Sequence, residues 1–325
     1  MKPISHTMRH SSLLAFSLVF MTLLSCAPSA PKDGYVGPYT VTTLLRGVYD
    51  IVDGNEQNPP GYHQDASGKS TGMNNTSNMY LVVGKKAALL IDLSNNVKWM
   101  DNAADSLRKV VYDRIGELPL LIAITHSHGD HTGMKDAFLE DANATFLLPE
   151  ADFKARSPFP MEKSTLFQEG YEIDLGGRVV KTLVVPGHTA GSTVFFLEGE
   201  QTAFTGDAIG SGTGVWIFSL DTFKAYEKGL DHFIEYLEDP ANKLDLKKLQ
   251  FYGGHAYQSA FVDGFDAQCV YDARTAVEQF KSGKLQPEKS AHGSGRMDTD
   301  LIFGKGKITA PAQVFMDYKA ELGLE

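Results

Sequence analysis

Short apolar runs that end at glycine or polar residues recur along this chain, and their length and β-branched content predict strands. The clearest is the run Leu-Leu-Ile-Ala-Ile at residues 120–124. Residues 78–83 and 87–92 predict a hairpin that turns at Gly84 and Lys85. Other strands are expected within residues 39–53, 144–148 and 171–185, in a hairpin at 193–197 and 202–204, and around Gly304-Lys305-Gly306.

Apolar residues spaced three or four positions apart predict helices. In residues 95–113, such residues fall on one face: Val97, Met100, Ala104, Leu107 and Val111. Helices are also predicted at 132–139, 221–238, 262–281 and 311–322, and residues 284–295 are interpreted as a linker containing His292. Strands and helices alternate in both halves of the chain. We therefore expect an α/β fold, and the alternation fits a four-layer αββα sandwich.

The segment 125–131 reads Thr-His-Ser-His-Gly-Asp-His, an H-x-H-x-D-H pattern directly after the predicted strand at 120–124. Because side chains two positions apart in an extended segment point the same way, His126 and His128 can be directed at one point. Asp130 and His131 follow Gly129 and can be directed at a second point nearby. Imidazole and carboxylate are good ligands for ions such as zinc. The segment therefore predicts a metal site rather than a solvated turn.

Three later segments each offer one more ligand type beside glycine, after a strand-like run. The ligands are His188, Asp207 and His255. Glycine lets the backbone turn sharply and approach a bound group closely. The chain thus contains seven candidate metal ligands: His126, His128, Asp130, His131, His188, Asp207 and His255.

The order H-x-H-x-D-H, G-H, G-D and G-G-H resembles the metallo-β-lactamase-fold hydrolase superfamily. The resemblance implies one metal held by His126, His128 and His188, a second held by Asp130, His131 and His255, and a bridging Asp207. One β-lactam-hydrolysing subclass has a zinc-bound cysteine near the position of Asp207, whereas the two cysteines here are Cys26 and Cys269. The bridging aspartate looks instead like that of glyoxalase II, lactonases and metallo-phosphodiesterases.

The resemblance also implies a mechanism. Two divalent ions, expected to be Zn²⁺ with Mn²⁺ or Fe²⁺ as alternatives, share a hydroxide that attacks an ester, thioester, lactone, amide or phosphoester. Asp130 is expected to be both a ligand and the catalytic residue that orients the nucleophile and carries its proton. Three alternatives stay open: persulfide oxidation at a single iron, β-lactam hydrolysis, and a non-catalytic lipoprotein that binds through the same fold.

Further residues are assigned to the surroundings of this site. Trp216, Phe218 and Tyr257 are predicted to form a substrate rim, with core packing as the alternative for Trp216 and Phe218. In this superfamily an early loop often overhangs the metals, so the polar residues 55–77 are interpreted as a substrate flap. Asp92 ends a predicted strand and is expected to support a metal-binding histidine, with a helix-capping or turn aspartate as the alternative.

Composition and net charge limit the kinds of molecule that the protein is expected to bind. The chain has 325 residues, of which 42% are hydrophobic and 22% charged, which is enough apolar material for one large core. The formal net charge of −10 argues against a broad nucleic-acid surface. We find no clear basic cluster that would bind a glutathione thioester. A small-molecule substrate is therefore expected, and the sequence indicates no oligomeric state.

Residues 1–25 resemble the secretory signal of a bacterial lipoprotein. Lys2 and Arg9 precede an apolar run that is too short to span a bilayer, and Leu-Leu-Ser-Cys at 23–26 resembles a lipobox with Cys26 as the lipidated residue. Without residues 1–25 the net charge of −10 loses two positive charges and becomes −12. We expect residues 26–38 to tether one hydrolase domain, 39–325, to a membrane of the cell envelope, in the periplasm or at the surface. A cleaved signal that leaves an ordinary thiol is the alternative.

Overall fold

The computed structural model describes residues 33–56, 62–64, 70–73, 76–211, 214–256 and 265–324. These residues belong to one unit of the chain, Lys32–Glu325. Cys26, the rest of the leader and Tyr257 lie outside the described residues, as does most of the predicted flap. Within the flap, β4 (Tyr62–Gln64) and β5 (Ser70–Met73) pair as antiparallel strands.

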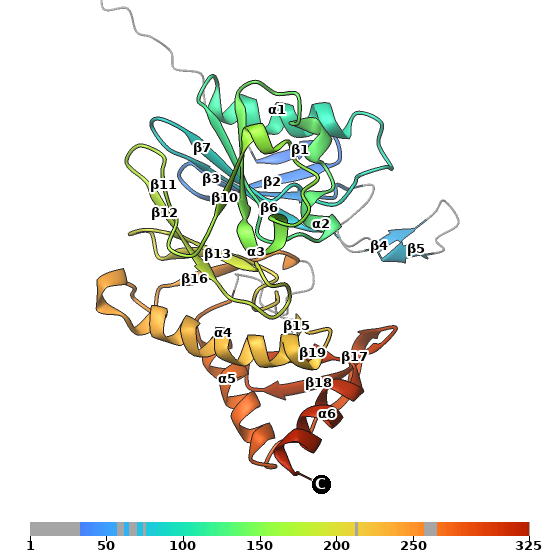
Figure 1. Ribbon diagram of the computed structural model, residues 1–325. Helices are drawn as coiled ribbons and strands as arrows, with labels where there is room; N and C mark the ends of the chain where they lie inside the picture. Colours follow the sequence, from blue (N-terminus) through green and yellow to red (C-terminus); the bar gives the residue numbers. More distant parts are fainter. Residues whose placement is uncertain are drawn as a thin grey trace, which may run out of the picture. The chain divides into compact units, whose positions relative to one another are not determined.

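The first sheet has eight strands in the order β1-β2-β3-β6-β7-β8-β9-β10 (Figure 1). Successive residues of a strand point to opposite faces. Leu81 and Leu90 therefore pack with helix α1 (Ala103–Ile115), while Tyr80 and Ile91 face the second sheet. The strands are β1 (Gly34–Val36), β2 (Tyr39–Leu45), β3 (Val48–Asp53), β6 (Asn78–Val83), β7 (Ala88–Ile91), β8 (Leu120–Ala123), β9 (Ala144–Pro149) and β10 (Ser164–Phe167).

The second sheet has five strands in the order β11-β12-β13-β14-β16. Phe195 packs against the first sheet, whereas its neighbour Phe196 packs on the other face with helix α4 (Leu220–Glu238). A capping box formed by Ser219 and Thr222 begins α4. The strands are β11 (Glu172–Asp174), β12 (Val179–Val184), β13 (Thr193–Leu197), β14 (Thr202–Gly206) and β16 (Gln250–Gly253).

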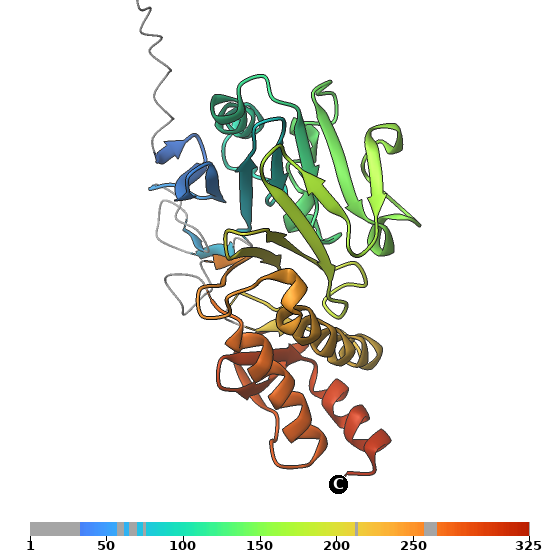
Figure 2. The same ribbon diagram turned by 90° about the vertical axis from the view of Figure 1, so that its left-hand side faces the viewer.

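The layers are therefore α1, the first sheet, the second sheet, and α4 with α5 (Gln268–Lys281), as Figures 1 and 2 show. Three separate apolar clusters fill the spaces between neighbouring layers. This arrangement confirms the predicted αββα sandwich. No helix in the described part of the chain is long and apolar enough to cross a membrane.

A third sheet, β15-β19-β18-β17, lies beside α5 and α6 (Ala312–Leu322) and extends the sandwich at its C-terminal end (Figure 1). Its strands are β15 (Val215–Trp216), β17 (Glu288–Ser294), β18 (Met297–Phe303) and β19 (Gly306–Ala310). The prediction of a linker at 284–295 is wrong, because β17 occupies most of it. As an edge strand of polar residues, β17 lacks the apolar alternation that would have revealed it.

Three predicted helices also need correction. Helix α1 begins at Ala103 rather than at residue 95, and the predicted helix at 132–139 is replaced by α2 (Gly129–Thr132) and a 3₁₀ turn, η1 (Lys135–Ala137). The backbone N–H groups of Gly133 and Met134 donate to the carbonyls of Ser94 and Leu93, each at 2.8 Å. This pairing holds both segments outside a helix. Helix α5 begins at residue 268 rather than 262.

Candidate metal centre

All seven candidate ligands follow the ends of strands and lie at one end of the two sheets. His126 and His128 follow β8, and the short helix α2 then carries Asp130 and His131. In the second sheet, β12, β14 and β16 run in the same direction, so their C-terminal ends share an edge. His188, Asp207 and His255 follow these three ends. The glycines beside them allow the turns that bring the side chains together.

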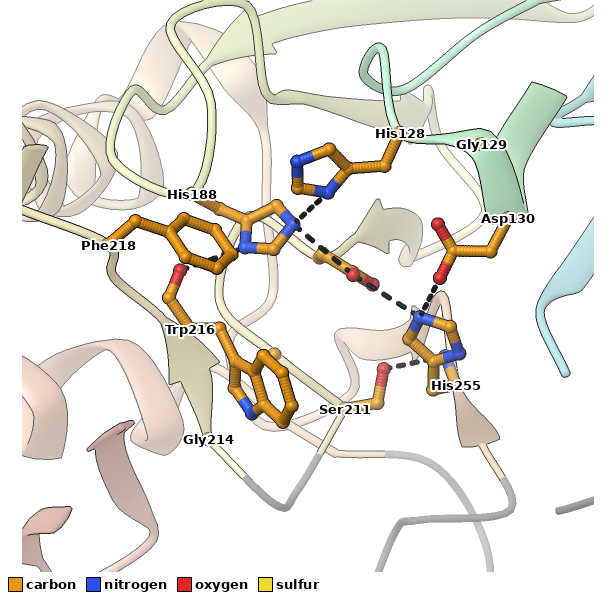
Figure 3. Close-up of a pocket in the computed structure, with 11 residues that line it drawn as sticks. His128, Gly129, Asp130, His188, Ser211, Gly214, Trp216, Phe218 and His255 are labelled. Carbon is orange, nitrogen blue, oxygen red and sulfur yellow. Dashed lines mark hydrogen bonds and ion pairs between the residues drawn. The ribbon is translucent and has the colours of Figure 1, made fainter. Parts of the chain in front are cut away.

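The seven side chains form overlapping groups, in each of which the ligand atoms lie within 4.8 Å of one another. We call His126, His128 and His188 the first trio, and Asp130, His131 and His255 the second trio. Figure 3 shows His128 and His188 on one side of the pocket, and Asp130 and His255 on the other. In the first trio, His128 Nδ1 and His188 Nε2 lie 2.9 Å apart.

Asp207 lies between the two trios. Its Oδ2 is 3.5 Å from His188 Nε2 and 3.3 Å from His255 Nε2. Its Oδ1 is 3.6 Å from His131 Nε2. The carboxylate thus has one oxygen near members of both trios, which is the position that a bridging ligand would take.

The burial of three candidate ligand atoms and their lack of hydrogen-bond partners within the described residues fit a metal site. Among the described residues, His126 Nε2, His131 Nε2 and Asp207 Oδ1 are buried and have no hydrogen-bond partner. Leaving a buried polar atom unpaired costs about 1–3 kcal/mol, so three such atoms in one cluster need a ligand to satisfy them. Neutral imidazole nitrogens and a carboxylate oxygen are the donors that zinc and similar ions prefer.

Gly254 leaves room for this cluster. A Cβ atom at position 254 would lie 2.4 Å from Asp207 Oδ1 and 2.7 Å from His131 Cε1. Any larger residue would therefore displace two candidate ligands. Close approach therefore requires the glycine before His255.

Asp92 supports the first trio through Thr125, and this is the kind of role that the sequence suggested for it. Its Oδ1 accepts from the backbone N–H of Thr125 at 2.7 Å, and its Oδ2 accepts from Thr125 Oγ1 at 2.8 Å. Thr125 Oγ1 in turn lies 3.0 Å from His126 Nδ1. The alternative, that Asp92 caps a helix, does not describe these contacts.

Two other histidines are oriented by backbone carbonyls. His188 Nδ1 lies 2.9 Å from the carbonyl oxygen of Trp216, and His255 Nδ1 lies 2.7 Å from that of Thr76. A carbonyl only accepts, so each Nδ1 carries the proton and each Nε2 lone pair faces the cluster. Sequence reasoning missed Thr76 and could not find either contact, because a main-chain carbonyl leaves no residue-type signature.

Burial and neighbouring charges shift the pKa values of the candidate ligands in opposite directions. Burial lowers the pKa of His188 to about 4, so this imidazole is neutral at pH 7 and free to bind a cation. Burial lowers the pKa of His131 as well, but the carboxylates of Asp92 and Asp207 outweigh it and hold that pKa well above its usual value. For Asp207, burial raises the pKa, but His255 and His131 leave it well below its usual value.

A pocket of about 300 Å³ opens over the cluster. Trp216 and Phe218, both half-buried, line it next to His188 (Figure 3). The Phe218 ring centroid is 5.5 Å from that of His188 and 5.9 Å from that of His128. The two aromatic residues therefore border the site and are not packed wholly in the core.

Within the described residues, Cys269 and the other histidines lie on other elements. His232 lies on the partly exposed surface of α4, with its Nε2 2.7 Å from Glu169 Oε1. Cys269 is a free, buried thiol on α5. His63 and His292 lie on β4 and β17.

Comparison with known proteins identifies the class. A model of the metallo-beta-lactamase superfamily matches residues 73–248, which is more than half of the chain. The fold resembles a crystal structure described as a beta-lactamase domain protein from Burkholderia ambifaria, with a TM-score of 0.52 and 14% identity over 80% of this chain and 84% of that one. Such identity shows the shared fold alone. The chain belongs to the metallo-β-lactamase superfamily.

Two curated relatives carry more specific names. The chain is 28% identical to an acyl-coenzyme A thioesterase, MBLAC2, of Gallus gallus over 173 residues, which are 44% of this chain and 61% of that protein. It is 35% identical to a hydroxyacylglutathione hydrolase of Mesorhizobium japonicum over 96 residues, which are 30% of this chain and 36% of that protein. The chain spans less than two thirds of the length of these relatives.

Proposed function

We propose that this protein is a two-metal hydrolase that cleaves a neutral ester, thioester or lactone with an apolar acyl or aryl part. The observation that carries the proposal is the convergence of seven ligand side chains, of which five line one pocket and three have buried unpaired ligand atoms. The first trio would hold one divalent ion, the second trio another, and Asp207 would bridge them. Zn²⁺ is the ion that this donor set favours.

Bound ions at such a site supply a water of lowered pKa and polarise the bond to be cleaved. The residues of the chain orient the reactants and move the proton. Asp130 lines the pocket with its Oδ2 3.5 Å from His255 Nε2, so it is placed to orient the attacking water and accept its proton. Water adds to the carbonyl carbon, the bond from that carbon to the leaving oxygen or sulfur breaks, and the leaving group takes up the proton. No serine or cysteine nucleophile is required.

The charge of the surrounding loops supports a neutral substrate. Residues 125–134, 186–192, 207–219 and 253–265 carry all seven ligands and contain no lysine or arginine. In residues 54–78 the only such residue is Lys69. An anionic carrier such as glutathione or coenzyme A would find no cationic side chain on the ligand-bearing loops to replace its hydration. Trp216 and Phe218 offer apolar area instead.

The thioesterase and hydroxyacylglutathione hydrolase names of the two relatives support acyl transfer to water as the reaction class. The aspartate at position 207 favours this class over the cysteine-ligated β-lactamase subclass. Persulfide oxidation at one iron could use the same ligands, and the number and kind of bound ions distinguish it from the two-metal hydrolase. A non-catalytic role is disfavoured because all seven ligand positions are filled.

The test is a substrate panel with the full chain loaded with Zn²⁺ or Mn²⁺. The panel contains an aryl ester, a thioester, a lactone, a β-lactam and a phosphodiester. We expect turnover of the first three, lost in His188→Ala and retained in His232→Ala, which removes a histidine that neither lines the pocket nor belongs to the ligand groups. Turnover of the β-lactam alone, or none together with one bound iron, would contradict the proposal.

A further inference from the structure

Three consecutive buried residues, where the chain enters β6 of the first sheet, contact either a member of the second trio or the residues on each side of His255. Thr76 and Ser77 are 0% exposed and Asn78 is 1% exposed. They are separated from His255 by more than 170 positions in the sequence, yet they meet the loop that follows β16. We call Thr76, Ser77 and Asn78 the β6 clamp.

The first two residues of the β6 clamp act on two ligands directly. The carbonyl of Thr76 lies 2.7 Å from His255 Nδ1 and fixes the ring so that Nε2 faces Asp130 and Asp207. Ser77 Oγ donates to the carbonyl oxygen of Asp130. One bond therefore sets the orientation of an imidazole, and the other sets the backbone that carries a carboxylate.

Asn78 holds the peptide groups on both sides of His255. Its backbone N–H donates to the carbonyl of Gly254 at 2.7 Å, and its Oδ1 accepts from the N–H of Ala256 at 2.8 Å. Tyr80 adds a third contact, since its hydroxyl donates to the carbonyl of Gly253 at 2.6 Å. The loop after β16 is thus bonded to β6 and the residues before it at each position from 253 to 256.

Two carboxylates of β3 anchor the β6 clamp. Asp53 Oδ1 accepts from the backbone N–H of Ser77 at 3.1 Å, and Asp50 Oδ1 accepts from Asn78 Nδ2 at 2.8 Å. Asn78 Nδ2 can only donate and its Oδ1 only accept, so the amide links Asp50 to Ala256 in one orientation. These hydrogen bonds link β3 and β6 of the first sheet to the loop after β16 of the second sheet, which carries His255.

The geometry points to the β6 clamp as the set of positioning residues for the second metal. This inference rests on the proposed two-metal site. The first trio has its own supports, Thr125 behind His126 and Trp216 behind His188. Loss of the clamp should therefore weaken binding at the second trio and leave the first trio loaded. Removing a contact of this kind typically lowers metal affinity by about 10- to 100-fold.

The experiment is a Zn²⁺ titration of the full chain against a chromophoric chelator, for wild type, Asn78→Ala and Ser77→Ala. Two dissociation constants are measured for each, with the melting temperature at saturating Zn²⁺. The matched control is Thr182→Val, which removes a buried hydroxyl that bonds both backbone groups of Tyr171 outside the site. We expect the weaker constant to rise about 10- to 100-fold in both clamp variants. The tighter constant should stay unchanged, and the control should alter neither.

A double variant tests positioning against general structural damage. Asp50→Asn with Asn78→Asp reverses donor and acceptor within the pair and keeps an oxygen for the N–H of Ala256. Recovery of the second Zn²⁺ in this variant supports the inference. If both constants are unchanged in Asn78→Ala and Ser77→Ala, or both weaken equally, the inference alone is overturned. A wild-type chain that binds a single ion would overturn the proposed function, and the inference with it.

Discussion

His131 Nδ1 lies 2.7 Å from Asp92 Oδ2, and both side chains are buried. The same carboxylate oxygen accepts from Thr125 Oγ1, which contacts His126. His126 belongs to the first trio and His131 to the second. One carboxylate thus orients an imidazole of each, in contrast to the β6 clamp, which contacts the second trio.

This relationship predicts that Asp92→Ala weakens both metal sites. Without the acceptor, the rings of His126 and His131 lose their fixed orientation, and each Zn²⁺ dissociation constant should rise about 10- to 100-fold. Asp92→Asn keeps one acceptor but has no charge. Its two Zn²⁺ dissociation constants should therefore lie between those of wild type and those of Asp92→Ala. The chelator titration measures both constants, with Asp113→Ala on the exposed face of α1 as the control. Weakening of one ion only would show that Asp92 serves a single trio.

Because Asp53 is buried, we expect the free energy of unfolding to depend on pH. Burial raises the pKa of Asp53 to about 7, whereas an aspartate in an unfolded chain has a pKa of about 3.9. Between these values the folded protein holds a proton that the unfolded chain releases. The free energy of unfolding therefore falls as pH rises from about 4 to 7, by up to about 4 kcal/mol, and this loss is complete above 7.

The variant Asp53→Asn removes this titration and keeps an acceptor for the N–H of Ser77. Urea unfolding of both proteins at pH 5 and pH 8 should show a smaller loss of stability for the variant over this interval. The difference between the two proteins isolates Asp53, since their other titrating groups are the same. Parallel curves would mean that Asp53 is charged in the folded protein throughout.

The absence of lysine and arginine from the ligand-bearing loops predicts discrimination by substrate charge. The neutral 4-nitrophenyl butyrate should have a kcat/KM at least about tenfold higher than its anionic analogue 4-nitrophenyl hemisuccinate, a difference of about 1.4 kcal/mol. Trp216→Ala should raise KM for the neutral ester. Lys181→Ala, on β12, is the control. Preference for the anionic ester would contradict the neutral-substrate proposal.

We expect lipid bound covalently to Cys26 to attach the protein to a membrane. Acylation at the lipobox would give two or more chains, and two anchor a protein firmly where one binds weakly. Cell fractionation should find wild type with the membranes and Cys26→Ala in the soluble fraction. Cys269→Ala is the control, because its thiol is buried on α5. A membrane-bound Cys26→Ala variant would show that the attachment lies elsewhere.

The sequence predicted the layers of the fold and the seven candidate ligands because both depend on local pattern. Strand periodicity places Leu90 and Ile91 on opposite faces, and ligand residues beside glycine at strand ends need no knowledge of long-range contacts. It did not predict β17, whose polar residues take their conformation from pairing with β18. It also missed the β6 clamp, because Thr76 acts through a carbonyl and Asn78 through contacts nearly 180 positions away.

The most direct test of the two-metal site is the number of Zn²⁺ ions that remain on dialysed wild type and on Asp207→Ala. Asp207 lies between the trios, so it would screen the repulsion between two cations and fix their spacing. We predict about two ions for wild type and about one for the variant, whose turnover should fall on the order of 10²-fold. Two tightly held ions in Asp207→Ala, or fewer than two in wild type, would contradict a dinuclear centre bridged by this carboxylate.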